Sequence, residues 1–123
     1  MFENTKAFSG FAVDDVAKAR EFYEGTLGLS VSDAEGGLVL HPAGGRDTFV
    51  YPKPDFEPAT YTILNFPVDD VDSAVEELAK RGVSLERYEG TDQDEKGISR
   101  SPSGPVIAWF TDPAGNILSV LEM

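Results

Sequence analysis

Residues able to carry out covalent catalysis are sparse in this sequence. It contains no cysteine and a single histidine, His41. Disulfides, thiolate nucleophiles and thiolate metal sites are therefore excluded, and one histidine cannot build a metal centre, so we interpret His41 as a surface or edge residue. No G-x-S-x-G elbow is present. Four serines lack a recognisable base partner: Ser9, Ser101, Ser103 and Ser119. The sequence gives no sign of nucleophilic catalysis.

Aromatic residues and one arginine suit the binding of a small molecule. Trp109 is the only tryptophan, and Tyr51 and Tyr61 stand on either side of a proline-rich stretch. Such rings offer flat surfaces to an aromatic or cationic guest. Arg100 lies in a polar, glycine-rich stretch at 89–105, which we expect to be a long mobile loop of the kind that often borders a ligand site. It could close over an anionic group, and a solvated arginine is the alternative.

The charge balance excludes some partners. Acidic residues outnumber basic ones by 22 to 10, which gives a formal net charge of −12. Nucleic acid and anionic membrane are therefore not expected as partners, since both require clustered lysine and arginine. The negative charge has two interpretations: it keeps the protein soluble through repulsion between molecules, or it attracts a cationic ligand. Neither a secretory signal nor an apolar run of about 20 residues occurs, so we expect a cytoplasmic protein.

An internal repeat organises the chain. The segments FSGFAVDDV at 8–16 and ILNFPVDDV at 63–71 share five residues at a constant offset of 55. A repeat just under half the chain long indicates duplication of a supersecondary unit. The matched residues are Phe11, Val13, Asp14, Asp15 and Val16 in the first copy and Phe66, Val68, Asp69, Asp70 and Val71 in the second.

Each copy predicts the same order of elements. A strand, at 7–13 or 61–68, is followed by an aspartate pair that can cap a helix. The helix carries an apolar stripe and ends at glycine. Three short strands follow in each copy, at 29–32, 37–41 and 48–51 and at 84–88, 106–111 and 116–121. The pattern is βαβββ twice, joined by a linker at 52–59.

One turn can be predicted in detail. Asp112 to Asn116, DPAGN, suits a type I turn closed by a glycine in the left-handed region. In that hairpin Asp112 faces Asn116, and Trp109 faces Ser119. The turn therefore predicts which side chains share a face of the sheet.

Three segments together resemble the vicinal-oxygen-chelate superfamily, which includes glyoxalase, bleomycin-resistance and extradiol dioxygenase proteins. They are FAVDDVAKAREFYEGTLGL, FPVDDVDSAVEELAKRGV and WFTDPAGNILSVLE. The resemblance is greatest to its uncharacterised single-domain, glyoxalase-like bacterial subgroup. It implies an α+β fold in which two tandem βαβββ modules form a curled eight-stranded sheet with helices on the outer face. A single domain is expected over 1–123, with module 1 at about 1–55 and module 2 at about 56–123. The family also implies a homodimer.

The residues at the family's metal-binding positions do not form a set of metal ligands. Metal-dependent relatives hold a divalent ion with side chains from four strand positions, which correspond here to Phe8, Ile63, Ser119 and a residue within 49–51. Phenylalanine and isoleucine have no donor atom. Moving each strand by one residue supplies no ligand set either, and His41, Asp47 and Glu122 lie outside these positions. We therefore expect no metal and no cofactor.

The strand alternation predicts a mostly apolar cup. Its lining consists of Phe8, Ile63, Asn65, Trp109, Ile117, Ser119 and Leu121. An apolar hollow with two hydrogen-bonding groups is typical of small-molecule sites. The alternative is that these side chains fill the hollow and form core.

Three hypotheses follow. The first is a metal-independent protein of the glyoxalase/bleomycin-resistance type that binds a small organic molecule, with ligand-binding residues Phe8, Tyr51, Ile63, Asn65, Trp109, Ser119 and Arg100. The second is a metal-free, glyoxalase-like lyase or isomerase acting on a small oxo compound through Asn65, Ser119, Tyr51 and Glu122. The third is a structural or regulatory module with a filled cup. The sequence leaves open whether any reaction is catalysed.

Overall fold

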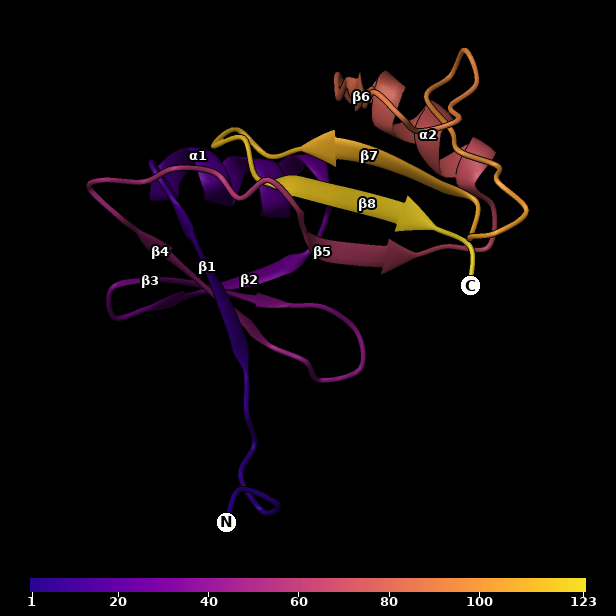
Figure 1. Cartoon of the computed structure of the whole chain (residues 1–123). Coiled ribbons are helices and arrows are strands. Elements are labelled where there is room, and N and C mark those ends of the chain that lie inside the picture. The colour runs from indigo at the N-terminus through magenta and orange to yellow at the C-terminus, as the bar shows by residue number, and fades with distance from the viewer. The chain divides into compact units, whose positions relative to one another are not determined.

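The computed structural model describes all residues from 1 to 123. The chain divides into two compact units, Met1–Pro58 and Ala59–Met123. Each unit contains helix and one four-stranded sheet, and neither sheet closes into a barrel (Figure 1). The predicted α+β fold of two tandem βαβββ modules is therefore confirmed, with the eight strands divided between two sheets. No helix has the length and apolar character that crossing a membrane requires.

The N-terminal unit has the strand order β1-β4-β3-β2. Its first and last strands are parallel, and the other neighbours are antiparallel. A short α-helix continues as a π-helical turn, η1, between the first two strands. In chain order the elements are β1 (Ser9–Val13), α1 (Val16–Arg20), η1 (Glu21–Thr26), β2 (Ser30–Ala34), β3 (Gly37–His41) and β4 (Thr48–Pro52).

The C-terminal unit repeats this topology with the strand order β5-β8-β7-β6. Again the first and last strands are parallel, and the remaining pairs are antiparallel. Because both units share strand order and orientation, the repeat seen in the sequence is a repeat of structure. Its elements are β5 (Thr62–Pro67), α2 (Val71–Lys80), β6 (Leu85–Glu86), β7 (Ile107–Thr111) and β8 (Ile117–Leu121).

The repeated aspartates start both helices. The Asp15 carboxylate accepts a hydrogen bond of 3.1 Å from the Lys18 N–H. The Asp70 carboxylate accepts one of 3.0 Å from the Asp72 N–H. Both satisfy N–H groups that have no partner within the helix. The α2 helix ends before Gly82, whose φ of 81° lies in the left-handed region that glycine adopts at low cost.

The predicted hairpin between β7 and β8 is confirmed. Gly115 has a φ of 94°, and the Asp112 N–H donates to the Asn116 carbonyl at 3.0 Å. The resulting register pairs Trp109 with Ser119. Cross-strand partners point to the same face of a sheet, so these two side chains are neighbours.

One face of the C-terminal sheet is covered by α2. The Glu122 carboxylate accepts a 2.9 Å hydrogen bond from the Val71 N–H, which ties the helix to the even-numbered side of β8. The helix buries an apolar stripe at Val71, Val75 and Leu78. The sheet buries Ala108, Phe110, Leu118 and Val120. The opposite face, with the odd-numbered residues of β7 and β8, lies away from the helix.

The segment predicted as a long loop, 89–105, is held by specific contacts. Ile98 is fully buried, and the backbones of Ser99 and Ile107 exchange two hydrogen bonds of 2.8 and 3.1 Å. The Gln93 amide donates to the Glu86 carbonyl at 2.9 Å. The segment therefore packs as part of its unit, and β6 shortens to two residues.

Candidate functional site

Four side chains form a row across the odd-numbered face of the C-terminal sheet. The register pairs Asn65 with Ser119, Ser119 with Trp109, and Trp109 with Glu86. The row therefore crosses all four strands, one residue from each. We call it the open-face row: Asn65, Ser119, Trp109 and Glu86. It places an amide, a hydroxyl, an indole and a carboxylate on one face of the sheet.

The polar end of the row is built by Asn65 and Ser119. The Ser119 hydroxyl donates to the Asn65 amide oxygen at 2.6 Å. Ser119 is fully buried while Asn65 is exposed, so the bond satisfies the buried hydroxyl. It also fixes the amide, because its oxygen faces Ser119 and its NH₂ group, with two donors, points elsewhere. This arrangement offers hydrogen-bond donors to a ligand oxygen.

The aromatic end of the row is built by Trp109 and Tyr88. Their rings meet edge to face, with centroids 5.6 Å apart and planes at 78°. The Glu86 carboxylate accepts a 3.3 Å hydrogen bond from the Thr111 hydroxyl. Burial raises the pKa of the Tyr88 hydroxyl, and the negative charge of Glu86 adds to that effect. The phenol therefore stays neutral near pH 7.

Glu86 and Tyr88 are candidate site residues that sequence reasoning missed. Residues 84–88 were predicted as a strand, but nothing in the sequence fixed its register against β7. The pairing of Glu86 with Trp109 supplies that register. A weak signal was available: in an alternating strand Glu86 and Tyr88 point to the same face, opposite to the exposed Arg87.

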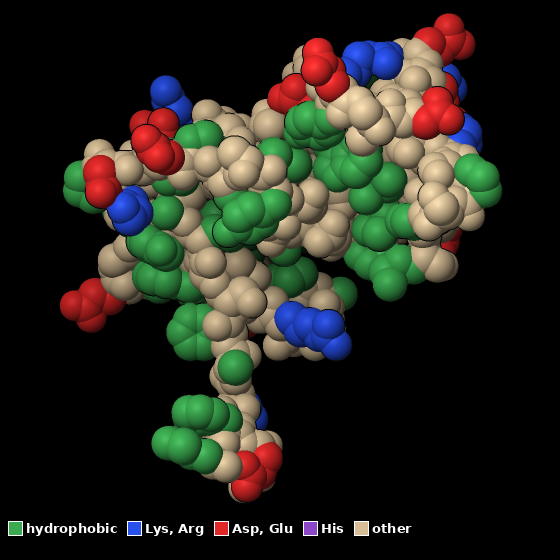
Figure 2. All heavy atoms as spheres, viewed as in Figure 1, with side chains coloured by type: hydrophobic (Ala, Val, Ile, Leu, Met, Phe, Trp, Pro, Cys, Tyr) green, Lys and Arg blue, Asp and Glu red, His purple; other side chains and the backbone are tan.

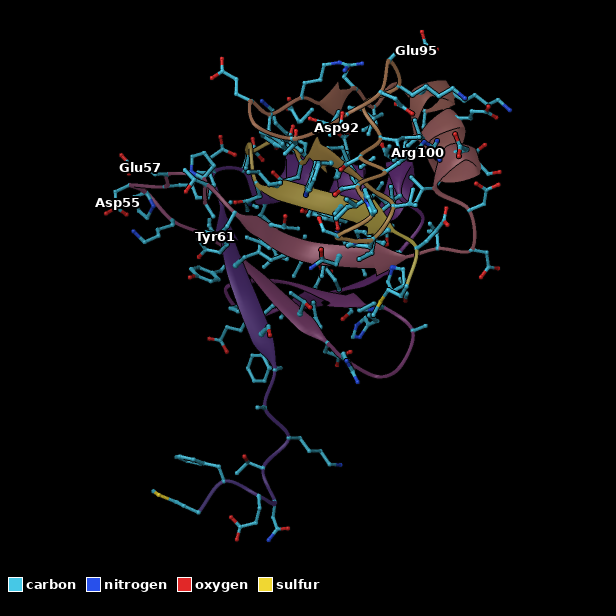
Figure 3. The ribbon with its side chains drawn as sticks, turned by 45° about the vertical axis from the view of Figure 1, so that its right-hand side comes forward. Asp55, Glu57, Tyr61, Asp92, Glu95 and Arg100 are labelled. Atoms are coloured by element: carbon cyan, nitrogen blue, oxygen red, sulfur yellow. The ribbon has the colours of Figure 1, made fainter.

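Arg100 lies apart from the open-face row. Its guanidinium donates hydrogen bonds to both carboxylate oxygens of Asp72, at 2.7 and 2.9 Å, and a further one of 3.2 Å to the carboxylate of Asp94. These bonds raise the pKa of Arg100, with Asp72 the main cause. Figure 3 shows Arg100 beside α2, and Figure 2 shows acidic and basic side chains mixed over this helix and the adjoining loop. A ligand role for Arg100 would require its release from both carboxylates.

The remaining predicted residues lie in different settings. Ile63 stands at an irregularity of β5, where the register shifts between Thr62 and Leu64. Phe8 precedes β1 with 71% of its surface exposed. The Tyr51 ring stacks on Phe49 in the N-terminal unit, with centroids 5.7 Å apart. Asn65, Trp109 and Ser119 are thus the predicted residues that the structure brings together.

Comparison with known proteins establishes the family. The model of the Glyoxalase/Bleomycin resistance protein/Dioxygenase superfamily matches residues 7–120. The chain belongs to this superfamily. The resemblance to vicinal-oxygen-chelate proteins is therefore confirmed. No curated protein matches the sequence at a significant level.

Three solved structures illustrate the likeness. TnmS3, an antibiotic-binding protein from Streptomyces sp. CB03234, is 24% identical with a TM-score of 0.68, over 97% of each chain. A glyoxalase/bleomycin resistance protein from the same organism is 25% identical with a TM-score of 0.62, over 94% of this chain and 100% of that one. The fosfomycin resistance protein FosX from Listeria monocytogenes is 14% identical with a TM-score of 0.73, over 98% and 93%. These likenesses show a shared fold.

The donor atoms at the superfamily's metal positions do not fit a divalent ion. Phe8 and Ile63 have no donor, and the Ser119 hydroxyl is committed to Asn65. No group of three histidine, cysteine or acidic side chains is placed to hold an ion. Such ions require several oxygen or nitrogen donors converging on one point.

Proposed function

We propose that this protein is a metal-independent small-molecule-binding protein of the glyoxalase/bleomycin-resistance type, and that its ligand is held in an apolar cup that includes the open-face row. The observation that carries the proposal is the row itself, in which Asn65 and the buried Ser119 share a sheet face with Trp109. Ligand sites in proteins combine apolar and aromatic walls with a few fixed polar groups.

The chemistry of the row supports one class of ligand. Trp109 and Tyr88 offer aromatic surface, which favours a planar or aromatic group. The Asn65 NH₂ group lies two strands from Trp109 and suits a carbonyl or ether oxygen. Glu86 and the formal net charge of −12 favour a cationic substituent. We therefore expect an organic molecule with an aromatic body, an acceptor oxygen and a positive charge.

The superfamily supports binding of this kind. Its description includes bleomycin-resistance proteins, and TnmS3, which shares this fold, is an antibiotic-binding protein. Further contributions from Phe8, Tyr51, Ile63 and Arg100 are part of the proposal, as are a homodimeric, cytoplasmic protein and a single domain over residues 1–123. Partners such as nucleic acid are not proposed, because acidic residues dominate the sequence.

Fluorescence of the single tryptophan tests the proposal. Bleomycin and a panel of cationic and neutral aromatic compounds are titrated into the protein while Trp109 emission is followed. A saturable change is expected for at least one planar cationic compound. Asn65→Ala should weaken its binding about tenfold, because the loss of one hydrogen bond costs about 1 kcal/mol or slightly more.

A matched control is Asn4→Ala, which changes an exposed asparagine outside the sheets. It should leave affinity unchanged. Equal affinity in the wild type and Asn65→Ala would contradict a site at the row, and the absence of any saturable change across the panel would contradict the proposed ligand class.

A metal-free lyase or isomerase acting on a small oxo compound is the alternative. The Asn65 NH₂ group could stabilise an oxyanion, which is the observation in its favour. Glu122, one of its candidate groups, accepts a hydrogen bond from the Val71 N–H on the helix-covered face. Turnover of the methylglyoxal–glutathione adduct by chelator-treated protein, lost in Asn65→Ala, would favour this alternative over binding alone.

A further inference from the structure

A hydrogen-bonded chain of three side chains lies on the N-terminal sheet. The Ser32 hydroxyl oxygen is 2.7 Å from His41 Nε2, and His41 Nδ1 is 2.9 Å from a carboxylate oxygen of Asp47. Ser32 comes from β2, His41 ends β3, and Asp47 immediately precedes β4. Two neighbouring strands and the start of the next one therefore bring a serine, a histidine and an aspartate into contact, with the histidine in the middle.

The hydrogen-bond chemistry gives each group a definite role. A carboxylate accepts hydrogen bonds and has none to donate, so His41 Nδ1 carries the proton directed at Asp47. In the neutral ring Nε2 is then the bare nitrogen, and it accepts the proton of the Ser32 hydroxyl. A nucleophile in contact with a base that a third group orients is the arrangement that activates serine in acyl transfer.

The chain is accessible to a substrate. Solvent reaches 35% of the side-chain surface of His41 and 52% of that of Asp47, and Ser32 is exposed. β2 is the edge strand of its sheet, so every second residue directs its backbone N–H away from β3. Backbone N–H groups at such an edge are hydrogen-bond donors that a substrate carbonyl oxygen can use.

An apolar platform lies next to Ser32 on the same face. Cross-strand pairing places Ser32 opposite Val39, Val39 opposite Phe49, and Phe49 opposite Gly10. The Tyr51 ring stacks on Phe49. Gly10 adds no side chain to the platform, and the Tyr51 ring lies next to it: a Cβ at Gly10 would be 3.9 Å from Tyr51 Cε1. A short apolar chain attached to a carbonyl could lie on Val39 and Phe49 with its carbon near Ser32.

We propose that Ser32, His41 and Asp47 form a site that hydrolyses small carboxylic esters with apolar acyl groups. Ser32 Oγ bonds to the ester carbonyl carbon while its proton passes to His41 Nε2. The bond from that carbon to the alcohol oxygen breaks, and this oxygen takes the proton from Nε2. Water then attacks the acyl group and gives its proton to Nε2. The acyl–Oγ bond breaks and Oγ recovers the proton, so ester and water become acid and alcohol.

Covalent labelling of the unmodified protein tests the site directly. The protein is incubated with an alkyl fluorophosphonate, and the modified residue is mapped by tandem mass spectrometry. Labelling at Ser32 is expected, in preference to the other serines. Failure to label Ser32, or labelling spread evenly over exposed serines, would overturn the proposal. The mapping uses the natural chain, so its result does not depend on how a variant folds.

Hydrolysis of p-nitrophenyl butyrate provides the second measurement. Ser32→Ala and His41→Ala should each lower the rate about 100-fold or more, the contribution of a positioned base. Asp47→Asn should lower kcat while leaving KM nearly unchanged, since Asp47 acts through His41. Ser30→Ala is the matched control, because Ser30 shares the strand and face of Ser32. Equal rates in Ser32→Ala and Ser30→Ala would refute the assignment. This site and the open-face row belong to different units, so either can fail alone.

Discussion

Ile98 should be a principal stabilising residue of the C-terminal unit although it lies within a polar, glycine-rich segment. Its side chain is fully buried, and its N–H and carbonyl are bonded to Asp94, at 3.0 and 2.9 Å. Replacing a buried isoleucine by alanine costs about 2–5 kcal/mol, through lost burial and the cavity left behind. A segment outside the sheet can partly collapse into that space, so we expect about 3 kcal/mol for Ile98→Ala.

The loss should be visible in urea unfolding followed by circular dichroism and in the melting temperature. A loss of about 3 kcal/mol corresponds to a fall in Tm of roughly 10 °C for a chain of this length. Hydrogen exchange should also accelerate at the amides of Ser99 and Ile107, whose mutual bonds hold the segment against β7.

The control for this prediction is Lys96→Ala in the same segment. Lys96 makes ion pairs of 3.7 Å to Asp72 and 3.9 Å to Glu76, and its side chain keeps 47% of its exposure. Exposed pairs of this kind contribute about 0–1 kcal/mol, so little change is expected. A cost below about 1 kcal/mol for Ile98→Ala, or equal costs for both variants, would refute the packing argument.

Two further predictions concern the start of α2. Asp70→Ala should lower the free energy of unfolding by about 1 kcal/mol, measured in urea, because the helix loses its cap; an unchanged value would show that water replaces the carboxylate. In acid, the hydrogen bond from Arg100 holds the pKa of Asp72 below its usual range, and the Ile98 N–H does the same for Asp94. A carboxyl whose pKa is lower in the folded protein than in the unfolded chain, where it is about 3.9, stabilises the folded state at any pH above that unfolded value. This stabilisation is lost as the pH falls through the pKa of the folded protein. The Ile98 amide resonance should therefore shift below about pH 4 and hold steady between pH 5 and 8; no shift in acid would contradict the contact.

The local signals that predicted the fold correctly are those carried by short stretches of chain. The turn from Asp112 to Asn116 fixes the β7–β8 register by itself, and Asp15 and Asp70 each cap a helix that begins at the next residue. Such features depend on neighbours within five residues, so the sequence contains all the necessary information.

Features that depend on distant partners could not be predicted in the same way. The register of β6 is set across the 89–105 segment, which hides the placement of Glu86 next to Trp109. The burial of Ile98 depends on packing against other elements, so a polar, glycine-rich sequence concealed it. The contact between Ser32 and His41 joins two strands whose register the sequence left open.

The candidate site was predictable where the hairpin governs it. Trp109 and Ser119 follow from the turn, and Asn65 joins them through the parallel pairing of β5 with β8. The sequence shows only that Arg100 lies in a polar segment, whereas its partner Asp72 belongs to a helix and lies 28 residues earlier in the chain. Contacts over such a separation are not encoded in local pattern.

The central claim is that this chain binds an organic ligand through its own side chains without a metal ion. The direct measurement is calorimetric titration of a binding aromatic cation into chelator-treated protein, repeated after addition of excess Mn²⁺ or Zn²⁺. We predict the same Kd in all three conditions and a weaker one for Asn65→Ala. Binding that appears only when metal is restored would contradict the claim.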